Sequence, residues 1–369
     1  MSLLHRVVAR RSLHRQYATV GSKTILGNPP KIPVPAPSIP QDGTQPLIPT
    51  SILNKHILSS LDGKATTLPS LIEQYTERHG RVLESSLSYE SRPSEGRKLK
   101  FDEGVELGDG VVMVAHALRY RAEFKITVCS GFALNASNEL SGSKGTLFLT
   151  CAHTFEEIRN SRLALDVLSN PFLSSSDTQH RSGSFIISGT PDAPVFHPVS
   201  SIASALHRSD LMILSASAST YTSTASRLNP SIYSSVHSLP VSPYPAPPGA
   251  AIRAHFVVDK KPAENGWKPW VGGTWSKWVK GKVLEYKDFA GREAQPGTYD
   301  SLSHLLFQPL PTPGSSGGPI IDEESGAVIG VMLGTRMDNR VAGVRGWGVP
   351  SETIFEMFSL PGLTLKNKF

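Results

Sequence analysis

Cysteine is almost absent from this sequence of 369 residues. Cys129 and Cys151 are the only two, and two thiols cannot build the several bridges of a small secreted domain or a four-cysteine zinc site. Neither an HExxH nor a CxxC motif is present. The composition therefore indicates a compartment in which thiols stay reduced, and we expect neither a metal nor an organic cofactor.

Long apolar runs and a strong net charge are also missing. No run approaches the ~20 apolar residues of a membrane-spanning helix, so we expect no membrane span. The formal net charge is +6, and four of these charges are arginines within the first 17 residues, which leaves about +2 (6 − 4) without them. Such a small charge is weak evidence for a nucleic-acid partner, and we expect none.

Acidic residues are absent from the first 41 positions, which contain six basic ones. The opening segment, MSLLHRVVARRSLHRQYATVGS, is rich in arginine, and arginines interrupt each short apolar run, so it fits a mitochondrial transit peptide better than a secretory signal. A disordered basic tail is the alternative. We predict a transit peptide over 1–17, a mature start at or near Tyr17 or Ala18, and a mitochondrial location, in the matrix rather than the intermembrane space.

An arm and a helical segment follow. Residues 28–49 contain eight prolines, which favour extended polyproline geometry, and we predict a Pro-rich arm or linker over 18–50. A helical extension is predicted over 51–100. Its second segment, PSLIEQYTERHG, begins with a serine cap and ends on Gly80. Its first segment has helical periodicity, and its apolar face comprises Ile52, Leu53, Ile57, Leu58 and Leu61.

From about residue 101 the chain consists of short apolar or alternating runs, separated by Gly, Ser, Asn, Asp and Pro. Many short runs at this spacing are typical of an all-β barrel or sandwich. The Ser- and Pro-rich stretch 215–249 divides them into two groups. We therefore predict two barrels, the first over about 101–225 and the second over about 250–358.

The stretch PTPGSSGGPIID, residues 311–322, has three interpretations: a phosphate-binding loop, a plain turn, or the position of a nucleophile. A phosphate-binding P-loop needs a lysine after its second glycine, and none is near. Clusters of glycine and serine are usually turns. The following residues, PIIDEESGAVIGVML, predict a strand, a turn and a second strand, which places the glycines on a tight bend at the rim of a barrel.

GSSGGP resembles the GxSGGP motif of the trypsin/chymotrypsin-like serine peptidase superfamily. Two further motifs follow the superfamily's order of His, Asp and Ser. LFLTCAHTF (147–155) resembles its [ST]-x-A-H motif, and RSDLMILSA (208–216) resembles its D-[LI]-x-[LIV]-L strand; 57 residues separate positions 153 and 210, and 106 separate 210 and 316. The resemblance covers about residues 101–358 and implies an all-β fold of two six-stranded antiparallel β-barrels.

The resemblance also implies a role for each matching residue. Ser316 is the expected nucleophile, His153 its general base, and Asp210 the acid that orients the imidazole. The backbone N–H groups of Gly314 and Ser316 are expected to form the oxyanion hole, with a glycine at 314 to avoid a Cβ clash. Three competing acids precede no buried strand of the DLMIL type: Asp166, Asp177 and Asp192.

Two departures from related enzymes concern domain content and activation. GSSGGPIIDEESGAVIGVMLG and GWGVPSETI are closer in style to the HtrA-like branch than to the digestive enzymes, yet eleven residues follow Phe358, so we do not expect the PDZ domain that is typical of HtrA proteins. Ser315 stands where digestive enzymes carry the aspartate that pairs with a newly cut N-terminus. A neutral serine cannot make that ion pair, and we expect an oxyanion hole that forms without cleavage.

The expected specificity pocket is apolar. Leu310, six residues before the nucleophile, stands at the pocket base, where a trypsin-like enzyme needs an acid. Met332 and Leu333 are expected on the pocket-wall strand, although a slip of one residue would exchange its faces. We therefore predict a preference for apolar rather than basic residues at the cleavage site.

The sequence as a whole predicts a serine endopeptidase that cleaves protein or peptide substrates through an acyl-enzyme. The alternative is a catalytically silent trypsin-like module that acts as a binding or structural subunit of a mitochondrial assembly. The tryptophan segment 267–278 holds four of the five tryptophans and is expected to cover a barrel end or a partner surface rather than to stack on nucleic-acid bases. Cys151 is expected to be a buried strand cysteine rather than a redox-sensitive thiol near the site.

Overall fold

The computed structural model describes residues 51–62, 65–99, 101, 110–137, 146–168, 180–216, 236–339, 341 and 343–360. The predicted transit peptide (1–17) and Pro-rich arm (18–50) lie outside these residues. Asp177 and residues 217–235 of the stretch between the barrels also lie outside them. Within the described ranges, no helix has the length and apolar character needed to cross a membrane.

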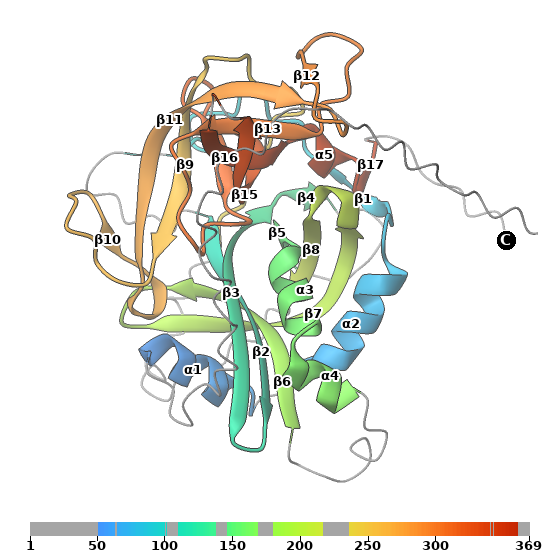
Figure 1. Cartoon of the computed structure of the whole chain (residues 1–369), viewed down its shortest axis with the longest axis vertical. Helices are drawn as coiled ribbons and strands as arrows, with labels where there is room; N and C mark the ends of the chain where they lie inside the picture. The colour runs from blue at the N-terminus through green and yellow to red at the C-terminus, as the bar shows by residue number, and fades with distance from the viewer. Residues whose placement is uncertain are drawn as a thin grey trace, which may run out of the picture. The chain divides into compact units, whose positions relative to one another are not determined.

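Six antiparallel strands close into a first barrel, drawn in teal to yellow-green in Figure 1, in the order β2-β3-β5-β8-β7-β6. Its strands are β2 (Val111–Tyr120), β3 (Glu123–Leu134), β5 (Thr146–Cys151), β6 (His180–Gly189), β7 (Pro194–Leu206) and β8 (Leu211–Ala216). Helices α3 (His153–Arg159) and α4 (Arg162–Leu168) follow β5 directly. The loop from β5 into α3 and the turn between β7 and β8 carry two of the expected site residues.

The second barrel also has six antiparallel strands, in the order β11-β13-β16-β15-β14-β9, and pairing of β9 with β11 closes it. Its strands are β9 (Ala251–Val258), β11 (Trp275–Lys287), β13 (His304–Gln308), β14 (Pro319–Asp322), β15 (Val328–Asn339) and β16 (Gly343–Pro350). The short strands β10 (Lys268–Pro269) and β12 (Glu293–Ala294) pair with β11. The prediction of two six-stranded antiparallel barrels is confirmed.

Strand β2 shows why its sequence, VVMVAHALRY, is apolar without alternation: both of its faces are buried. Successive side chains of a strand point to opposite faces. One set, Val112, Val114 and Leu118, packs in the interior of the barrel. The other set, Met113, Ala115 and Ala117, packs against Leu53, Ile57 and Leu58 of helix α1 (Ile52–Ser60). The helical extension therefore covers part of the outer face of the first barrel.

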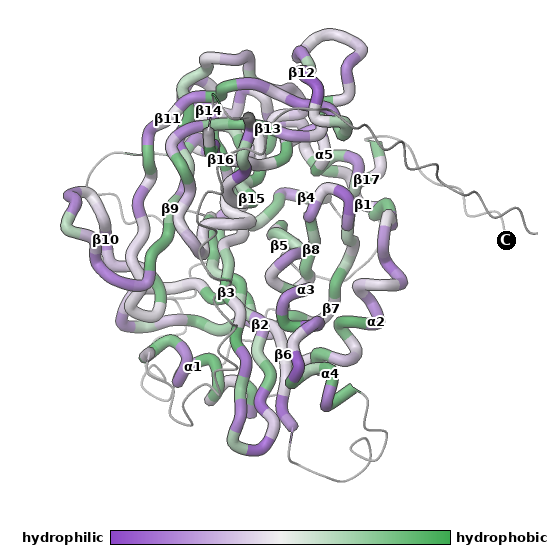
Figure 2. Tube along the Cα trace, viewed as in Figure 1, coloured by the Kyte–Doolittle hydropathy of each residue, from purple (hydrophilic) through white to green (hydrophobic). Residues whose placement is uncertain are grey.

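The two helices of this extension are amphipathic, and Figure 2 shows apolar and hydrophilic residues along both. Ser51 caps α1, because its Oγ accepts a hydrogen bond from the backbone N–H of Asn54 at 3.0 Å. Ile52 is 65% exposed, so its expected place on the apolar face is wrong. Helix α2 (Leu68–Glu77) begins two residues before the expected serine cap, with Thr67 at its N-cap, because proline is tolerated in the first turn of a helix.

A small third sheet joins distant parts of the chain in the order β17-β1-β4. Strand β1 (Leu83–Leu87) follows the helical extension, β4 (Ala136–Ser137) follows β3, and β17 (Phe358–Ser359) follows the last helix, α5 (Glu352–Phe355). β1 is parallel to β17 and antiparallel to β4. The extension is therefore a part of the folded domain and includes a strand that the sequence did not predict.

Candidate active site

His153 is the first residue of α3, two residues after β5 ends at Cys151. Its side chain is 42% exposed, so the ring is accessible to solvent. Its Nδ1 lies 2.6 Å from Oδ2 of Asp210. The buried strand β5 therefore places His153 at the rim of the first barrel, and the carboxylate of Asp210 contacts its Nδ1.

Asp210 lies between β7 and β8, directly after the short 3-10 helix η2 (His207–Ser209). It has the left-handed conformation, with φ 55° and ψ 36°, which costs a non-glycine residue roughly 1–2 kcal/mol. Its Oδ1 accepts hydrogen bonds from the backbone N–H groups of Ala152 (3.0 Å) and His153 (2.6 Å). These bonds offset the strain and fix the carboxylate relative to the imidazole.

The electrostatics of His153 favour its protonated form. Burial by itself acts to lower the pKa of His153, but the hydrogen bond and the charge of Asp210 outweigh it, with further contributions from Cys129 and Glu157. The pKa of His153 is therefore raised above its usual 6.5. A base with this shift holds an accepted proton more firmly than free imidazole does.

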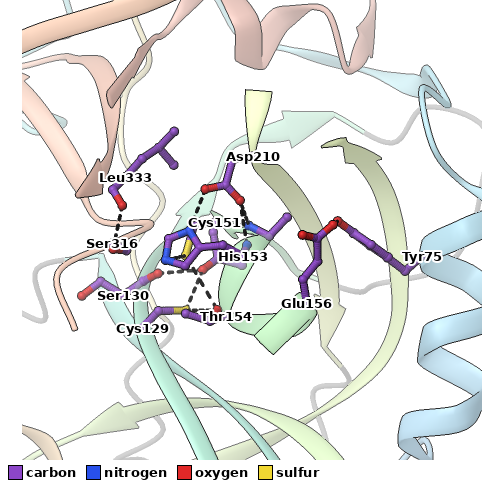
Figure 3. Close-up of polar contacts among 12 residues, drawn as sticks. Tyr75, Cys129, Ser130, Cys151, His153, Thr154, Glu156, Asp210, Ser316 and Leu333 are labelled. Atoms are coloured by element: carbon purple, nitrogen blue, oxygen red, sulfur yellow. Dashed lines mark hydrogen bonds and ion pairs between the residues drawn. The ribbon is translucent and has the colours of Figure 1, made fainter. Parts of the chain in front are cut away.

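Ser316 lies in the loop between β13 and β14, on the second barrel. Its Oγ donates a hydrogen bond of 2.9 Å to the carbonyl oxygen of Leu333 on β15. Figure 3 shows the hydroxyl of Ser316 directed to the carbonyl oxygen of Leu333. Among the described residues no hydrogen bond joins Ser316 to His153, whose Nε2 has its polar contact with Sγ of Cys151 at 3.8 Å.

The backbone of this loop leaves two N–H groups free. Residues 312–315 form a turn closed by the hydrogen bond from Ser315 N to Thr312 O (3.1 Å). Pro313 and Gly314, with φ +89° at the glycine, give it the signature of a type II turn. Within the described part of the chain, the N–H groups of Gly314 and Ser316 have no acceptor.

Two glycines of the loop are required for different reasons. A Cβ added at Gly314 would meet nothing within 4 Å, so the expected clash is wrong and the positive φ is the reason for glycine there. At Gly317, with φ +81°, an added Cβ would lie 2.2 Å from the carbonyl oxygen of Ser130. Gly317 therefore allows the loop to approach the first barrel closely.

Ser130, on β3, is a site residue that the sequence analysis missed. Its N–H donates to the carbonyl oxygen of Ser316 at 2.8 Å, and its Oγ donates to the carbonyl oxygen of Gly314 at 2.9 Å. Its own carbonyl accepts from Oγ1 of Thr150 at 2.7 Å. The first barrel thus holds the serine loop of the second barrel through two carbonyls. The only feature of the sequence that could have indicated its role is a hydroxyl residue inside an apolar strand.

The three residues expected in the specificity pocket differ in their exposure to solvent. Leu310 is 48% exposed. Met332 is fully buried in the core of the second barrel, and Leu333 is 4% exposed. The two side chains on β15 pack in different apolar clusters, Met332 in the core of the second barrel and Leu333 in the cluster that includes the core of the first. At the site, Leu333 contributes its carbonyl oxygen rather than an apolar side chain.

Both cysteines lie beneath the histidine and are free thiols. Cys151 is fully buried at the end of β5, and burial, with contributions from Cys129, raises its pKa. Burial also acts to raise the pKa of Cys129, but hydrogen bonds from Cys151, Thr150 and Thr154 outweigh it and lower that pKa to about 7. The two sulfurs fill the space between β3, β5 and α3.

The helical extension supports both elements of the first-barrel half of the site. Tyr75 of α2 is fully buried and donates its hydroxyl to Oε1 of Glu156 on α3 at 2.7 Å, as Figure 3 shows. Its ring lies 4.3 Å from that of His207, at the start of the turn that carries Asp210. Residues N-terminal to the barrels thus contact both α3 and the Asp210 turn.

The tryptophan segment packs against β9. Trp270 and Trp278 contact the buried ring of His255 edge to face, at 5.1 and 5.0 Å, and burial lowers the pKa of His255 to about 3. Lys261 lies over the ring of Trp275 at 5.1 Å. Within the described ranges, no group of three or more His, Cys, Asp and Glu side chains could hold a metal ion.

The arrangement of these parts decides the fold family. Two closed six-stranded barrels face each other across the site, with the histidine and aspartate on the first and the serine loop on the second. The chain has the trypsin-like fold. No protein-family model matches its sequence, and no curated protein matches it either.

Solved structures similar to this chain include the protease domain of MamO from Magnetospirillum magneticum, at 14% identity and a TM-score of 0.37, covering 69% of this chain and 98% of that one. Rv3671c from M. tuberculosis H37Rv is similar at 16% identity and a TM-score of 0.34, covering 69% and 92%. The thermostable serine protease AL20 from an extremophilic microorganism is similar at 12% identity and a TM-score of 0.36, covering 68% and 96%.

Proposed function

We propose that this trypsin-like chain is a serine endopeptidase that hydrolyses peptide bonds of protein or peptide substrates. One observation carries the proposal. A histidine held by a carboxylate at 2.6 Å lies beside a serine loop that presents two unpaired backbone N–H groups. A base, a nucleophile and a preorganised oxyanion site are the parts that acyl transfer needs.

In the proposed reaction, the hydroxyl of Ser316 turns from Leu333 to Nε2 of His153, a rotation about one side-chain bond. Oγ attacks the scissile carbonyl and its proton passes to Nε2, while the N–H groups of Gly314 and Ser316 bind the oxyanion. Collapse of the tetrahedral intermediate breaks the C–N bond, and the imidazolium protonates the leaving amine. Water then hydrolyses the acyl-enzyme with the same base, and Asp210 stabilises the imidazolium throughout.

The second candidate function is a catalytically silent module that binds a partner. The observation in its favour is the hydrogen bond from Ser316 to Leu333, which holds the hydroxyl away from the base. Hydrogen bonds of catalytic groups are often loose without substrate, so the same contact is compatible with an enzyme at rest. The two candidates predict opposite results with a reagent that requires an activated serine.

The decisive experiment is labelling of the purified mature protein with a fluorophosphonate, beside the Ser316→Ala and Asp210→Asn variants. The endopeptidase predicts labelling of the wild type, none of Ser316→Ala, and strongly slowed labelling of Asp210→Asn. Ser325→Ala is a matched control, because Ser325 bonds within its own turn to Asp322 at 2.6 Å, away from the loop. Absence of labelling in the folded wild type would support the silent module.

The proposed location is the mitochondrial matrix, supported by the arginine-rich, acid-free N-terminal segment. Import of the full chain into isolated mitochondria should shorten it to a start at or near Tyr17 or Ala18. A variant with Arg6, Arg10, Arg11 and Arg15 changed to glutamine should not be imported. Equal import of this variant would contradict the proposed transit peptide.

A further inference from the structure

Two hydroxyl side chains of the serine loop contact a single residue of strand β9. Oγ of Ser315 accepts a hydrogen bond from the N–H of Val257 at 2.9 Å, and Oγ1 of Thr312 donates to the carbonyl oxygen of Val257 at 2.8 Å. The two hydroxyl oxygens lie 2.8 Å apart. Ser315 is fully buried, so its bond to Val257 is shielded from water, and Thr312 is partly buried.

The direction of each hydrogen bond follows from counting protons. Each hydroxyl has one proton to donate. The proton of Thr312 goes to the Val257 carbonyl, so the contact between the hydroxyls must be donated by Ser315 and accepted by Thr312. The bonds then form a closed ring that runs from Val257 N–H to Ser315, to Thr312 and back to the Val257 carbonyl. Because every member is satisfied, loss of either hydroxyl breaks the ring.

Strand β9 needs this ring because its edge is open at Val257. β9 pairs with β14 from Ile252 to Ala254, and β14 begins only at Pro319. Val257 lies beyond that pairing, and its N–H and carbonyl point to the serine loop. Buried backbone groups without partners are costly. The two hydroxyls therefore take the place of a missing strand and tie the loop to the second barrel.

The ring also fixes the turn that carries Gly314. Thr312 and Ser315 are the first and last residues of that turn. On the opposite side, Ser130 of the first barrel holds the carbonyl groups of Gly314 and Ser316. The loop is thus held from both barrels by uncharged groups, and these contacts leave free the two N–H groups expected to bind the oxyanion.

We propose that Thr312 and Ser315 are positioning residues that hold the oxyanion loop on strand β9 through this hydroxyl ring, in place of a charged partner. The inference rests on the proposed peptidase function and deepens it. An oxyanion donor acts only when it is aimed at the developing charge. Breaking the ring should therefore weaken binding of the transition state more than binding of the substrate.

The test uses the full mature protein with Thr312→Val, Thr312→Ser, Ser315→Ala and the double variant Thr312→Val/Ser315→Ala. We measure kcat and KM on a fluorogenic peptide, and the inhibition constants of a peptide aldehyde and of the corresponding product acid. Thr312→Val and Ser315→Ala should each lower kcat by at least about tenfold. The upper limit is the ~10²–10³ that complete loss of one oxyanion donor costs. KM should stay within about twofold of the wild-type value.

Further results separate positioning from stability. The aldehyde forms a tetrahedral adduct with an oxyanion, so its affinity should fall in parallel with kcat/KM while that of the product acid stays unchanged. Thr312→Ser keeps the hydroxyl, so its kcat should lie within about threefold of the wild-type value. The double variant should be no slower than the worse single variant, because one missing hydroxyl already opens the ring.

Ser351→Ala is the matched control. Ser351 is also fully buried and donates its hydroxyl to a backbone carbonyl, that of Ser242, at 2.6 Å, away from the loop. It should lower the melting temperature and leave kcat unchanged. If the wild type turns over and Thr312→Val and Ser315→Ala keep its kcat and aldehyde affinity, the inference is wrong and the proposed function stands. A folded wild type that neither turns over nor reacts with fluorophosphonate overturns both.

Discussion

Replacement of Asp210 by asparagine tests how the site works, because it changes the chemistry and leaves the shape almost intact. Asparagine is isosteric and tolerates the left-handed conformation found at this position. Its amide oxygen can still accept from the N–H groups of Ala152 and His153. Its NH₂ group then faces Nδ1 of His153, which must become an acceptor and leave the proton on Nε2, where the base is needed.

The expected loss of kcat in Asp210→Asn is large. The same wrong-tautomer change in a Ser-His-Asp triad costs ~10⁴ in kcat, which corresponds to ~5 kcal/mol of activation free energy at 25 °C. Thermal unfolding of Asp210→Asn should stay close to that of the wild type. Asp210→Ala should unfold earlier, since it loses the hydrogen bonds of a charged group, each contributing roughly 1.5–3 kcal/mol, while the strained φ remains.

The assay is initial-rate kinetics on a fluorogenic peptide together with calorimetry of wild type, Asp210→Asn and Asp210→Ala. Asp166→Asn is the control for a change of charge, because Asp166 lies on the exposed side of α4, paired with Arg162 at 3.9 Å. A kcat for Asp210→Asn within tenfold of the wild type would refute the assignment of Asp210. Equal unfolding of the asparagine and alanine variants would refute the role of its backbone hydrogen bonds.

Three further predictions concern pH, the glycines and the extension. Because the pKa of His153 is raised above 6.5 and the base must be neutral, kcat/KM should rise with pH through an inflection above 6.5, and Asp210→Asn should move that inflection lower. Gly317→Ala, whose Cβ would lie 2.2 Å from a carbonyl oxygen, should lose far more activity and stability than Gly314→Ala, measured side by side. Tyr75→Phe removes the hydrogen bond of 2.7 Å from the buried Tyr75 to the partly buried Glu156 and should lower the unfolding free energy by roughly 1–3 kcal/mol in urea titrations, whereas exposed Tyr244→Phe should not.

The barrels could be predicted from the sequence because their strands are short and bounded by turn residues. His153 and Asp210 could be predicted from local motifs, since each follows or precedes a buried strand. Ser130 and Thr312 could not, because their partners lie 184 and 55 residues away in the sequence, and a hydroxyl within a strand or turn has no motif of its own. Such contacts depend on how the two barrels meet.

Two errors have local physical causes. Helical periodicity places Ile52 on the apolar face of α1, but the helix begins at this residue and its side chain lies beyond the barrel surface. The apolar run of β15 predicts wall side chains at Met332 and Leu333, but both are buried, Met332 in one apolar cluster and Leu333 in another. A pattern of apolar residues therefore predicts neither burial at the end of a helix nor which part of the core a buried side chain packs against.

The parallel pairing of β1 with β17 has a consequence for how the chain folds. The hydroxyl of Ser359 bonds the carbonyl of Leu83, 276 residues earlier, and the N–H of Leu83 bonds the carbonyl of Met357. β1 leaves the ribosome well before its partner, because Ser359 is made 276 residues after Leu83. Long-range pairings of this kind slow folding and leave apolar strands exposed in the meantime. Completion of the small sheet is therefore a late event, and a chain that stops before Phe358 would leave β1 without its parallel neighbour.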